Sequence, residues 1–228
     1  PDDPSHALVS MGIYVFNAEA LYGYLRADAR CAESTHDFGR DVIPKLLRDG
    51  ERVYAHRFAD SCVNMTDGHP YWRDVGTVDA YWEANLDLTR VQPELNMYDE
   101  QWPIRTLEEH LPPAKFVFES ADPRGQTLDA LVSSGCIVSG ASVIRSLLFT
   151  DVTVESGSVI EDSVLLPKVR VGRNVRLRRA IVDKFCVLPD EFTAGLDRAA
   201  DEARFHVTPR GAVLITPEML GQQVHGVR

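Results

Sequence analysis

The segment PYWRDVGT, residues 70–77, holds the densest group of side chains that could do chemistry. Asp74 stands beside an arginine and close to two aromatic residues, and such a carboxylate can hold a sugar hydroxyl or a hard cation such as Mg²⁺. Aromatic rings such as Trp72 pack against sugar faces. The competing interpretation is structural, with the tryptophan anchored in a core and a surface ion pair beside it. Thr77 predicts the start of a helix over 78–90.

Two other segments could contact a small molecule. In STHDFGRDVIP, residues 34–44, Asp37 could line a site, or it could cap the helix that follows while Gly39 serves a turn. In SMG, the small hydroxyl of Ser10 is followed by Gly12 at the start of a predicted strand, and this combination lets the backbone approach a ligand.

A basic stretch from Lys168 to Lys184 carries seven basic residues against one acid, in a chain of net charge −10. Arg170 and Arg176 are six residues apart, as are Arg173 and Arg179. On a coil with six-residue sides we expect each pair to stack on adjacent turns, which would form an anion site for a phosphorylated metabolite. A solvated charged face is the alternative.

The elements that must position these residues alternate between strand and helix in the first part of the chain. β-Branched and aromatic residues predict buried strands over 11–16 and 53–59. Asn17 can cap a helix that begins after it, and Gly50 can end a second, short helix. This alternation predicts an α/β layer.

The second half of the chain has a different pattern, which follows a proline-punctuated connector. Aliphatic residues recur there every six positions, in three registers separated by slips of four and three residues. This period predicts a parallel β-helix, left-handed as in hexapeptide proteins, whereas a β-sandwich would show a period of two. The residues are Val132, Val138, Ile144, Leu148, Val154, Ile160, Leu166, Val169, Val175, Ile181 and Val187.

Composition narrows the class of protein. With 228 residues, 44% hydrophobic and 25% charged, the chain is that of a globular protein with one large or two smaller domains. The net charge of −10 argues against general nucleic-acid binding. Because no apolar run is long enough for a membrane span and no signal peptide is evident, we expect a cytoplasmic protein. The proline-rich start without Met is interpreted as the middle of a longer protein. Reduced, mostly buried thiols are expected for Cys31, Cys62, Cys136 and Cys186.

The order of several motifs resembles bacterial glucose-1-phosphate adenylyltransferases. SMGIYVF, HDFGRDVIP, PYWRDVGTVDAYWEANLDL, YDEQWPIRT, LPPAKFV and the hexapeptide tail follow one another as in that family, from Val9 to about Leu220. The resemblance implies the C-terminal part of a Rossmann-like nucleotidyltransferase domain in 1–90, a connector in 91–115 and a left-handed β-helix for regulation and oligomerisation in 116–228. It also implies a homotetramer that converts ATP and glucose 1-phosphate to ADP-glucose and pyrophosphate with Mg²⁺, the committing step of bacterial glycogen synthesis.

The same resemblance implies roles for individual residues. Ser10 would contact glucose 1-phosphate. Asp37, Phe38 and Trp72 would line the sugar pocket. Asp74 looks like one of two aspartates that hold the catalytic Mg²⁺.

Effector sites are implied as well, for phosphorylated or carboxylate metabolites. Lys184, after Asp183, looks like part of the family's effector site, and Lys115 with Ser139 and Gly140 lies near a second effector pocket in some members. From the basic stretch, Arg176 and Arg179 join this set. Where enzymes activated by fructose 1,6-bisphosphate carry basic residues around a C-terminal EML, this sequence has Pro217 and Gly221.

Parts of the family pattern do not occur in these residues. The sequence contains no GGxGxRL loop, no second metal aspartate and no FVEKP lysine, so we expect no catalysis by residues 1–228 alone and expect the missing half in the same gene product. A non-catalytic regulatory subunit is the alternative to an active enzyme. A hexapeptide acyltransferase would need a histidine in the coil, and residues 131–190 contain none.

Overall fold

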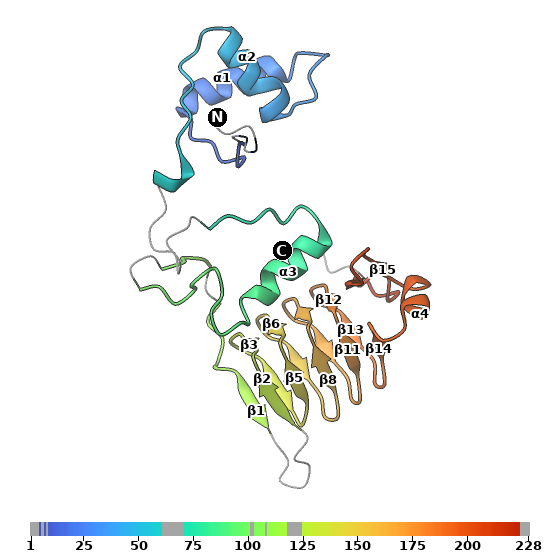
Figure 1. Ribbon diagram of the computed structural model, residues 1–228. Helices are drawn as coiled ribbons and strands as arrows, with labels where there is room; N and C mark the ends of the chain where they lie inside the picture. Colours follow the sequence, from blue (N-terminus) through green and yellow to red (C-terminus); the bar gives the residue numbers. More distant parts are fainter. Residues whose placement is uncertain are drawn as a thin grey trace. The chain divides into compact units, whose positions relative to one another are not determined.

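The computed structural model describes residues 5, 7, 9–60, 71–100, 103–107, 109–117 and 125–223, so that Cys62 lies outside the described part. The chain forms two compact units, Pro1–Asp60 and Ser61–Arg228 (Figure 1). Each unit has its own elements and its own packing.

The first unit is built on capped helices. Helix α1 (Ala18–Asp28) begins at Asn17, whose Oδ1 accepts hydrogen bonds from the N–H groups of Glu19 and Ala20 at 3.1 and 3.3 Å. A π-helical turn, η1 (Phe38–Val42), leads into α2 (Ile43–Arg48). The chain then reverses at Gly50, which has a φ of 74° and so adopts a backbone conformation that glycine tolerates best. A short 3₁₀ turn, η2 (Phe58–Asp60), closes the unit.

The strands predicted over 11–16 and 53–59 are wrong for this structure. Residues 11–16 are irregular, with Ile13 73% and Val15 97% exposed, and residues 53–57 are irregular up to η2. A strand needs a neighbour to pair its N–H and C=O groups, and the described part of this unit contains no strand that could serve as one. The residue types therefore favour a strand, but no partner strand is present in the described part of this unit.

Helix α3 (Val78–Asp87) is the first helix of the second unit in the described residues. Thr77 caps it as predicted, with Oγ1 accepting from Ala80 N–H at 3.1 Å, and the helix ends three residues before the predicted position. Its apolar face packs on the β-helix, where Trp82 meets Val164 and Ile181 in one buried cluster. Val78, Tyr81 and Leu86 lie on this face together with Trp82.

The second unit is a parallel β-helix of three sheets, consistent with the predicted left-handed coil (Figure 1). Ile137 pairs with Thr153, Thr153 with Arg170 and Arg170 with Val187, so that one coil takes 16 or 17 residues. Sheet A runs β1 (Lys115–Val117), β4 (Ile137–Ser139), β7 (Thr153–Val154), β10 (Arg170–Val171), β13 (Val187–Leu188). Sheet B runs β2 (Gln126–Leu128), β5 (Ser142–Ile144), β8 (Val159–Glu161), β11 (Arg176–Arg178), β14 (Thr193–Ala194). Sheet C runs β3 (Leu131–Val132), β6 (Leu147–Leu148), β9 (Val164–Leu165), β12 (Ala180–Val182), β16 (Val213–Ile215), with β15 (His206–Val207) antiparallel at its edge.

The six-residue period is right in kind and wrong in register at several positions. A coil of 16 or 17 residues has sides of unequal length, so a strict six-residue repeat drifts from the inner face to the outer face. Val187 is 51% exposed and its neighbour Leu188 is 1% exposed. Ile181 is buried from outside the coil, under α3. Predicted positions that do lie in the coil core are Val138, Leu148, Val154, Ile160, Val169 and Val175.

The last coil is closed by helix α4 (Arg198–Glu202) and the antiparallel strand β15. Asp201, 3% exposed, accepts a hydrogen bond from the Gly195 N–H at 2.8 Å and so ties α4 to the end of the coil. Among the helices within the described ranges, none has the length and apolar character of a membrane span.

Candidate functional site

Ser10 and Phe38, both predicted sugar-phosphate residues, are brought together through Tyr14. The Tyr14 ring stacks on Phe38 with 5.5 Å between centroids, and its hydroxyl lies 3.2 Å from Ser10 Oγ. The Gly12 N–H also donates to Ser10 Oγ at 3.2 Å. Tyr14 is not among the predicted site residues, although its place in SMGIYVF, four residues after Ser10, is a usable signal.

Asp37 has the capping role that the sequence allows. Its Oδ1 accepts from the Arg40 N–H at 2.8 Å at the start of η1, and its own N–H donates to Asp41 Oδ2 at 3.1 Å. The Thr35 hydroxyl donates to the same Asp41 oxygen at 2.6 Å and lowers the pKa of Asp41. Asp37 is exposed, so capping leaves its side chain accessible from solvent.

A carboxylate that the sequence analysis did not single out supports this loop. Asp28, 9% exposed at the end of α1, accepts from Ser34 Oγ at 2.6 Å and lies 2.8 Å from His36 Nδ1. These two hydrogen bonds lower the pKa of Asp28, with that from Ser34 the larger cause. His36 has a φ of 61° and immediately precedes Asp37, so the Asp28 contacts hold a left-handed residue at the loop's turning point.

Trp72 and Asp74 lie in the second unit. Trp72 is 47% exposed, so the interpretation of a core tryptophan does not apply to it. Asp74 is exposed, and its Oδ1 accepts from the Gly76 N–H at 3.0 Å in a tight turn before α3. The ion pair beside it joins Arg73 to Glu94, with 2.6 Å between Nη2 and Oε1.

The donor set for a cation is limited in the described residues, which contain no group of three His, Cys, Asp or Glu side chains placed to hold a metal ion. Mg²⁺ is usually held by about one or two carboxylates together with water and substrate phosphate oxygens. The exposed carboxylate of Asp74 fits as one such ligand.

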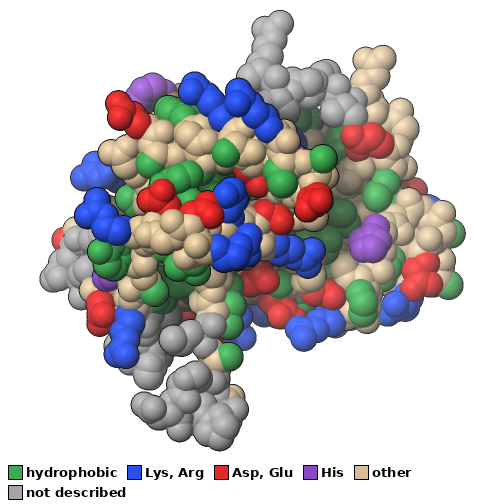
Figure 2. Space-filling model, turned by 90° about the horizontal axis from the view of Figure 1, so that it is seen from above, with side chains coloured by type: hydrophobic (Ala, Val, Ile, Leu, Met, Phe, Trp, Pro, Cys, Tyr) green, Lys and Arg blue, Asp and Glu red, His purple; other side chains and the backbone are tan. Residues whose placement is uncertain are grey.

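The predicted stacking of arginines in the basic stretch is wrong. Arg170 lies on sheet A and Arg176 on sheet B, so a spacing of six leads to the next side of the same coil. The residue paired with Arg170 in the adjacent coils is Thr153 or Val187, at a spacing of 17. Arg173 and Arg179 also belong to one coil, between β10 and β12. On the face drawn in Figure 2, Lys and Arg side chains lie among Asp and Glu side chains.

Four residues predicted to bind effectors lie near the two end strands of sheet A, β1 and β13. Lys115 begins β1, and the Gly140 N–H donates to the Val117 carbonyl at 2.7 Å, which places Ser139 and Gly140 beside the same strand. Lys184 is exposed just before β13, the strand at the opposite end of sheet A.

The two arginines of that set differ in their surroundings. Arg176 is exposed on sheet B. The Arg179 guanidinium lies over the Trp82 ring, 4.7 Å from its centroid, and donates to the Arg210 carbonyl at 2.6 Å.

Two of the cysteines are unsuited to nucleophilic chemistry. Cys136 and Cys186 are fully buried, and burial raises the pKa of Cys186 to about 12 and also raises that of Cys136. Since the thiolate is the reactive form, neither is a nucleophile at neutral pH. Cys31 is exposed, so two of the three cysteines in the described residues are buried, in agreement with the expectation of mostly buried thiols.

Two family models match the chain, one in its first part and one in its second, in the order that the motifs predict. A family model described as nucleotidyl transferase matches residues 1–91. A second, described as GlmU-like, C-terminal hexapeptide, matches residues 112–215.

Several curated proteins match the whole chain. Glucose-1-phosphate adenylyltransferases of Nitrosospira multiformis and Methylobacillus flagellatus are each 60% identical to it over 228 residues, and that of Nitrosomonas europaea is 58% identical. Each alignment covers 100% of this chain and 53% of the relative, so the chain spans about half the length of the curated relatives it matches. Over its whole length the chain is therefore similar to about half of a glucose-1-phosphate adenylyltransferase, with a nucleotidyl transferase part followed by a hexapeptide part.

Proposed function

We propose that the protein carrying this chain transfers the adenylyl group of ATP to glucose 1-phosphate, forming ADP-glucose and pyrophosphate in the cytoplasm for glycogen synthesis. The observation that carries this proposal is the identity of 58 to 60% over all 228 residues to proteins of that name. A regulatory subunit without activity is not favoured, because the chain keeps Ser10, Asp37, Trp72 and Asp74.

The chemistry needs positioning and charge stabilisation and no protein nucleophile. A phosphate oxygen of glucose 1-phosphate forms the new bond to the α-phosphorus of ATP, while the bond from that phosphorus to the bridging oxygen breaks and pyrophosphate leaves. Bound Mg²⁺ would neutralise charge on the phosphates, and Asp74 would hold it. Ser10 would donate a hydrogen bond from its hydroxyl to the sugar phosphate.

The aromatic residues would orient the sugar. Phe38, stacked on Tyr14, and the exposed ring of Trp72 offer the flat apolar faces that sugars pack against. Asp37, which caps η1 and is exposed, would accept a hydrogen bond from a sugar hydroxyl.

Regulation belongs to the same proposal. Exposed cations at both ends of sheet A, Lys115 and Lys184, would bind phosphorylated or carboxylate metabolites on the β-helix of a homotetramer. The Ser139 hydroxyl and the Gly140 backbone would complete the Lys115 site, and Arg176 would add a cation on sheet B.

The test is a substrate survey with the purified natural gene product that contains this chain. With Mg²⁺, ATP and glucose 1-phosphate we expect ADP-glucose and pyrophosphate in equal amounts. Other sugar 1-phosphates and other nucleoside triphosphates should react far more slowly. Preferred use of a different sugar phosphate, or no product from any pair, would contradict the proposal.

A further inference from the structure

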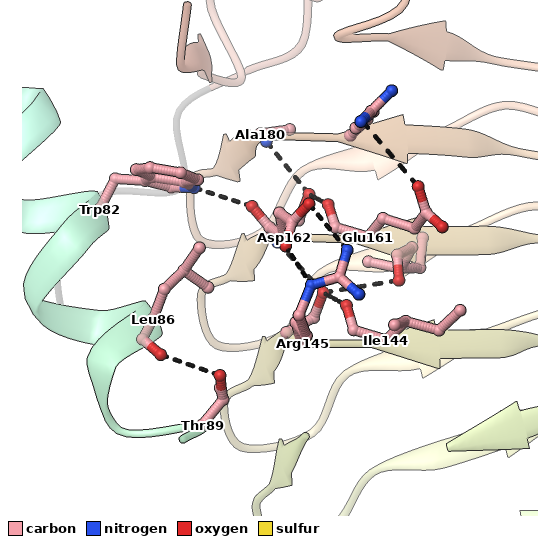
Figure 3. Close-up of polar contacts among 12 residues, drawn as sticks. Trp82, Leu86, Thr89, Ile144, Arg145, Glu161, Asp162 and Ala180 are labelled. Atoms are coloured by element: carbon pink, nitrogen blue, oxygen red, sulfur yellow. Dashed lines mark hydrogen bonds and ion pairs between the residues drawn. The ribbon is translucent and has the colours of Figure 1, made fainter. Parts of the chain in front are cut away.

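Helix α3 is attached to one corner of the β-helix by its tryptophan. Trp82 is 9% exposed, and its indole Nε1 donates to the backbone oxygen of Asp162 at 2.8 Å (Figure 3). The ring packs with Val164 and Ile181 of sheet C. Because the donor occupies one fixed position on a rigid ring, this contact sets the rotation of α3 about its axis as well as its distance from the coil.

The corner that receives Trp82 is held by a directional ion pair. Arg145 and Asp162 occupy equivalent corner positions in successive coils, with φ values of 45° and 46°. The Arg145 guanidinium donates to both carboxylate oxygens, Nε to Oδ1 at 2.7 Å and Nη2 to Oδ2 at 3.0 Å (Figure 3). A bidentate pair of this kind fixes orientation. The Asp162 carbonyl is therefore a well-placed acceptor for the indole.

Arg179 completes the contact from the next coil. It takes the same corner conformation, with a φ of 52°, and its guanidinium carbon lies 4.7 Å from the Trp82 ring centroid. Its Nη2 donates to the Arg210 carbonyl at 2.6 Å, and the Arg210 side chain pairs with Glu83 on α3. Arg179 thus links the coil, the ring of Trp82 and the chain segment after β15.

The same helix holds the segment that contains Asp74. At its first turn, the Thr77 cap and the Asp74 turn follow each other directly in the chain. At its other end, Glu94 pairs with Arg73 at 2.6 Å, and the Glu94 N–H donates to buried Asp87 at 3.0 Å. The residues on both sides of Asp74 are therefore tied to α3.

We propose that Trp82 and Arg179 are positioning residues for Asp74: they fix α3 on the β-helix corner, and α3 fixes the segment 71–77. The proposal rests on the proposed function, in which Asp74 holds Mg²⁺. It gives Arg179 a role different from that of an effector ligand, since its guanidinium is already occupied by Trp82 and Arg210.

The principal test is Arg179→Ala in the natural gene product that contains this chain. We expect kcat to fall by about 10- to 100-fold, as when a reacting group is displaced by about 1 Å. Mn²⁺ binding, measured by electron paramagnetic resonance without turnover, should weaken, and amide hydrogen exchange in 71–81 should accelerate. Trp82→Phe keeps an aromatic ring but lacks the donor to Asp162, and should shift the same three quantities less.

Two further variants separate positioning from general damage. Arg179→Lys keeps a cation over Trp82 and should recover part of the loss. Arg178→Ala is the matched control, because this neighbouring arginine is exposed on sheet B and pairs with Glu161 at 4.0 Å. It should leave kcat, Mn²⁺ affinity and exchange as in the wild type.

Several outcomes would overturn the proposal. Unchanged exchange in 71–81 in Arg179→Ala, or a change confined to effector half-saturation, would remove Arg179 from positioning. A wild type that makes no ADP-glucose would contradict the proposed function, while the exchange and Mn²⁺ comparisons would still decide whether Arg179 and Trp82 hold the segment.

Discussion

Asp74 can be tested without disturbing its turn. Asp74→Asn keeps an oxygen that accepts the Gly76 N–H but removes the negative charge. We expect kcat to fall by roughly two to four orders of magnitude, the scale of losing a main contact to transition-state charge. Steady-state kinetics over a range of Mg²⁺ concentrations measure this. A variant with wild-type kcat would show that Asp74 holds no catalytic cation.

Ser10 should affect substrate binding more than turnover. Its hydroxyl lies between Tyr14 and the Gly12 N–H, so the side chain is oriented before substrate arrives. Ser10→Ala should raise KM for glucose 1-phosphate by roughly 5- to 30-fold, equivalent to about 1–2 kcal/mol for a hydrogen bond to a charged group, with kcat little changed. Tyr14→Phe, which removes the partner hydroxyl, should raise KM less. A large fall in kcat for Ser10→Ala would reverse the roles assigned to Ser10 and Asp74.

Asp28 gives the loop before Asp37 a dependence on pH. Its pKa is lowered from 3.8 by Ser34 and His36, so folding favours the ionised form. This contribution to stability is present above the unfolded-state pKa and is lost as pH falls through the lower folded-state pKa. Asp28→Asn should therefore lower the free energy of unfolding at neutral pH, and the difference from wild type should shrink below about pH 4. Urea unfolding at several pH values measures it, with the exposed Asp49→Asn as the control. A difference independent of pH would exclude this origin.

The elements differ in how far sequence alone predicts them. Helix starts at Asn17 and Thr77 depend on contacts within three residues, so their residue types suffice. The β-helix was predictable from its repeat, because each coil presents the same positions inward. Residues 11–16 were not, because a strand depends on a partner elsewhere. The position of α3 on the β-helix was not predictable either, because Trp82 and Asp162, which form the contact, are 80 residues apart in the chain.

The register of the coil can be tested with two adjacent residues. Leu188 is 1% exposed in the core and Val187 is 51% exposed, although the six-residue period placed Val187 inside. Leu188→Ala should lower the free energy of unfolding by about 2–5 kcal/mol, and Val187→Ala by less than about 1 kcal/mol. Thermal or urea unfolding of the two variants compares them. Equal effects, or a larger one at Val187, would contradict the 16- or 17-residue coil.

The observed coil of 16 or 17 residues changes where an effector could bind on the β-helix. The predicted arginine pairs do not stack on adjacent coils, because a spacing of six residues leads to the next side of the same coil. What remains is a set of exposed cations at separate places, with Lys115 at one end of sheet A and Lys184 at the other. An anion site at either end must therefore depend on a few residues, and the loss of one cation should be measurable.

Lys184 is the residue on which that dependence can be decided. It is exposed at the corner before β13, where its N–H donates to Asp183 Oδ1 at 2.8 Å, so replacing the side chain leaves this backbone contact in place. Lys184→Ala should weaken effector binding by roughly 10- to 150-fold, as expected when a charge-assisted hydrogen bond is lost. Because allosteric coupling is a difference in effector affinity between two states, activation or inhibition should weaken while the rate without effector persists.

The measurement is a titration of AMP, fructose 6-phosphate and pyruvate against wild type and Lys184→Ala, with Lys45→Ala on helix α2 as the control for loss of a surface lysine. Unchanged half-saturation for every effector that acts on the wild type would remove Lys184 from regulation. A collapse of the rate without effector would instead place Lys184 in folding or in contacts between subunits. If Lys184→Ala changes effector affinity and Lys45→Ala does not, a charge on the β-helix controls turnover at active-site residues that lie outside the coil.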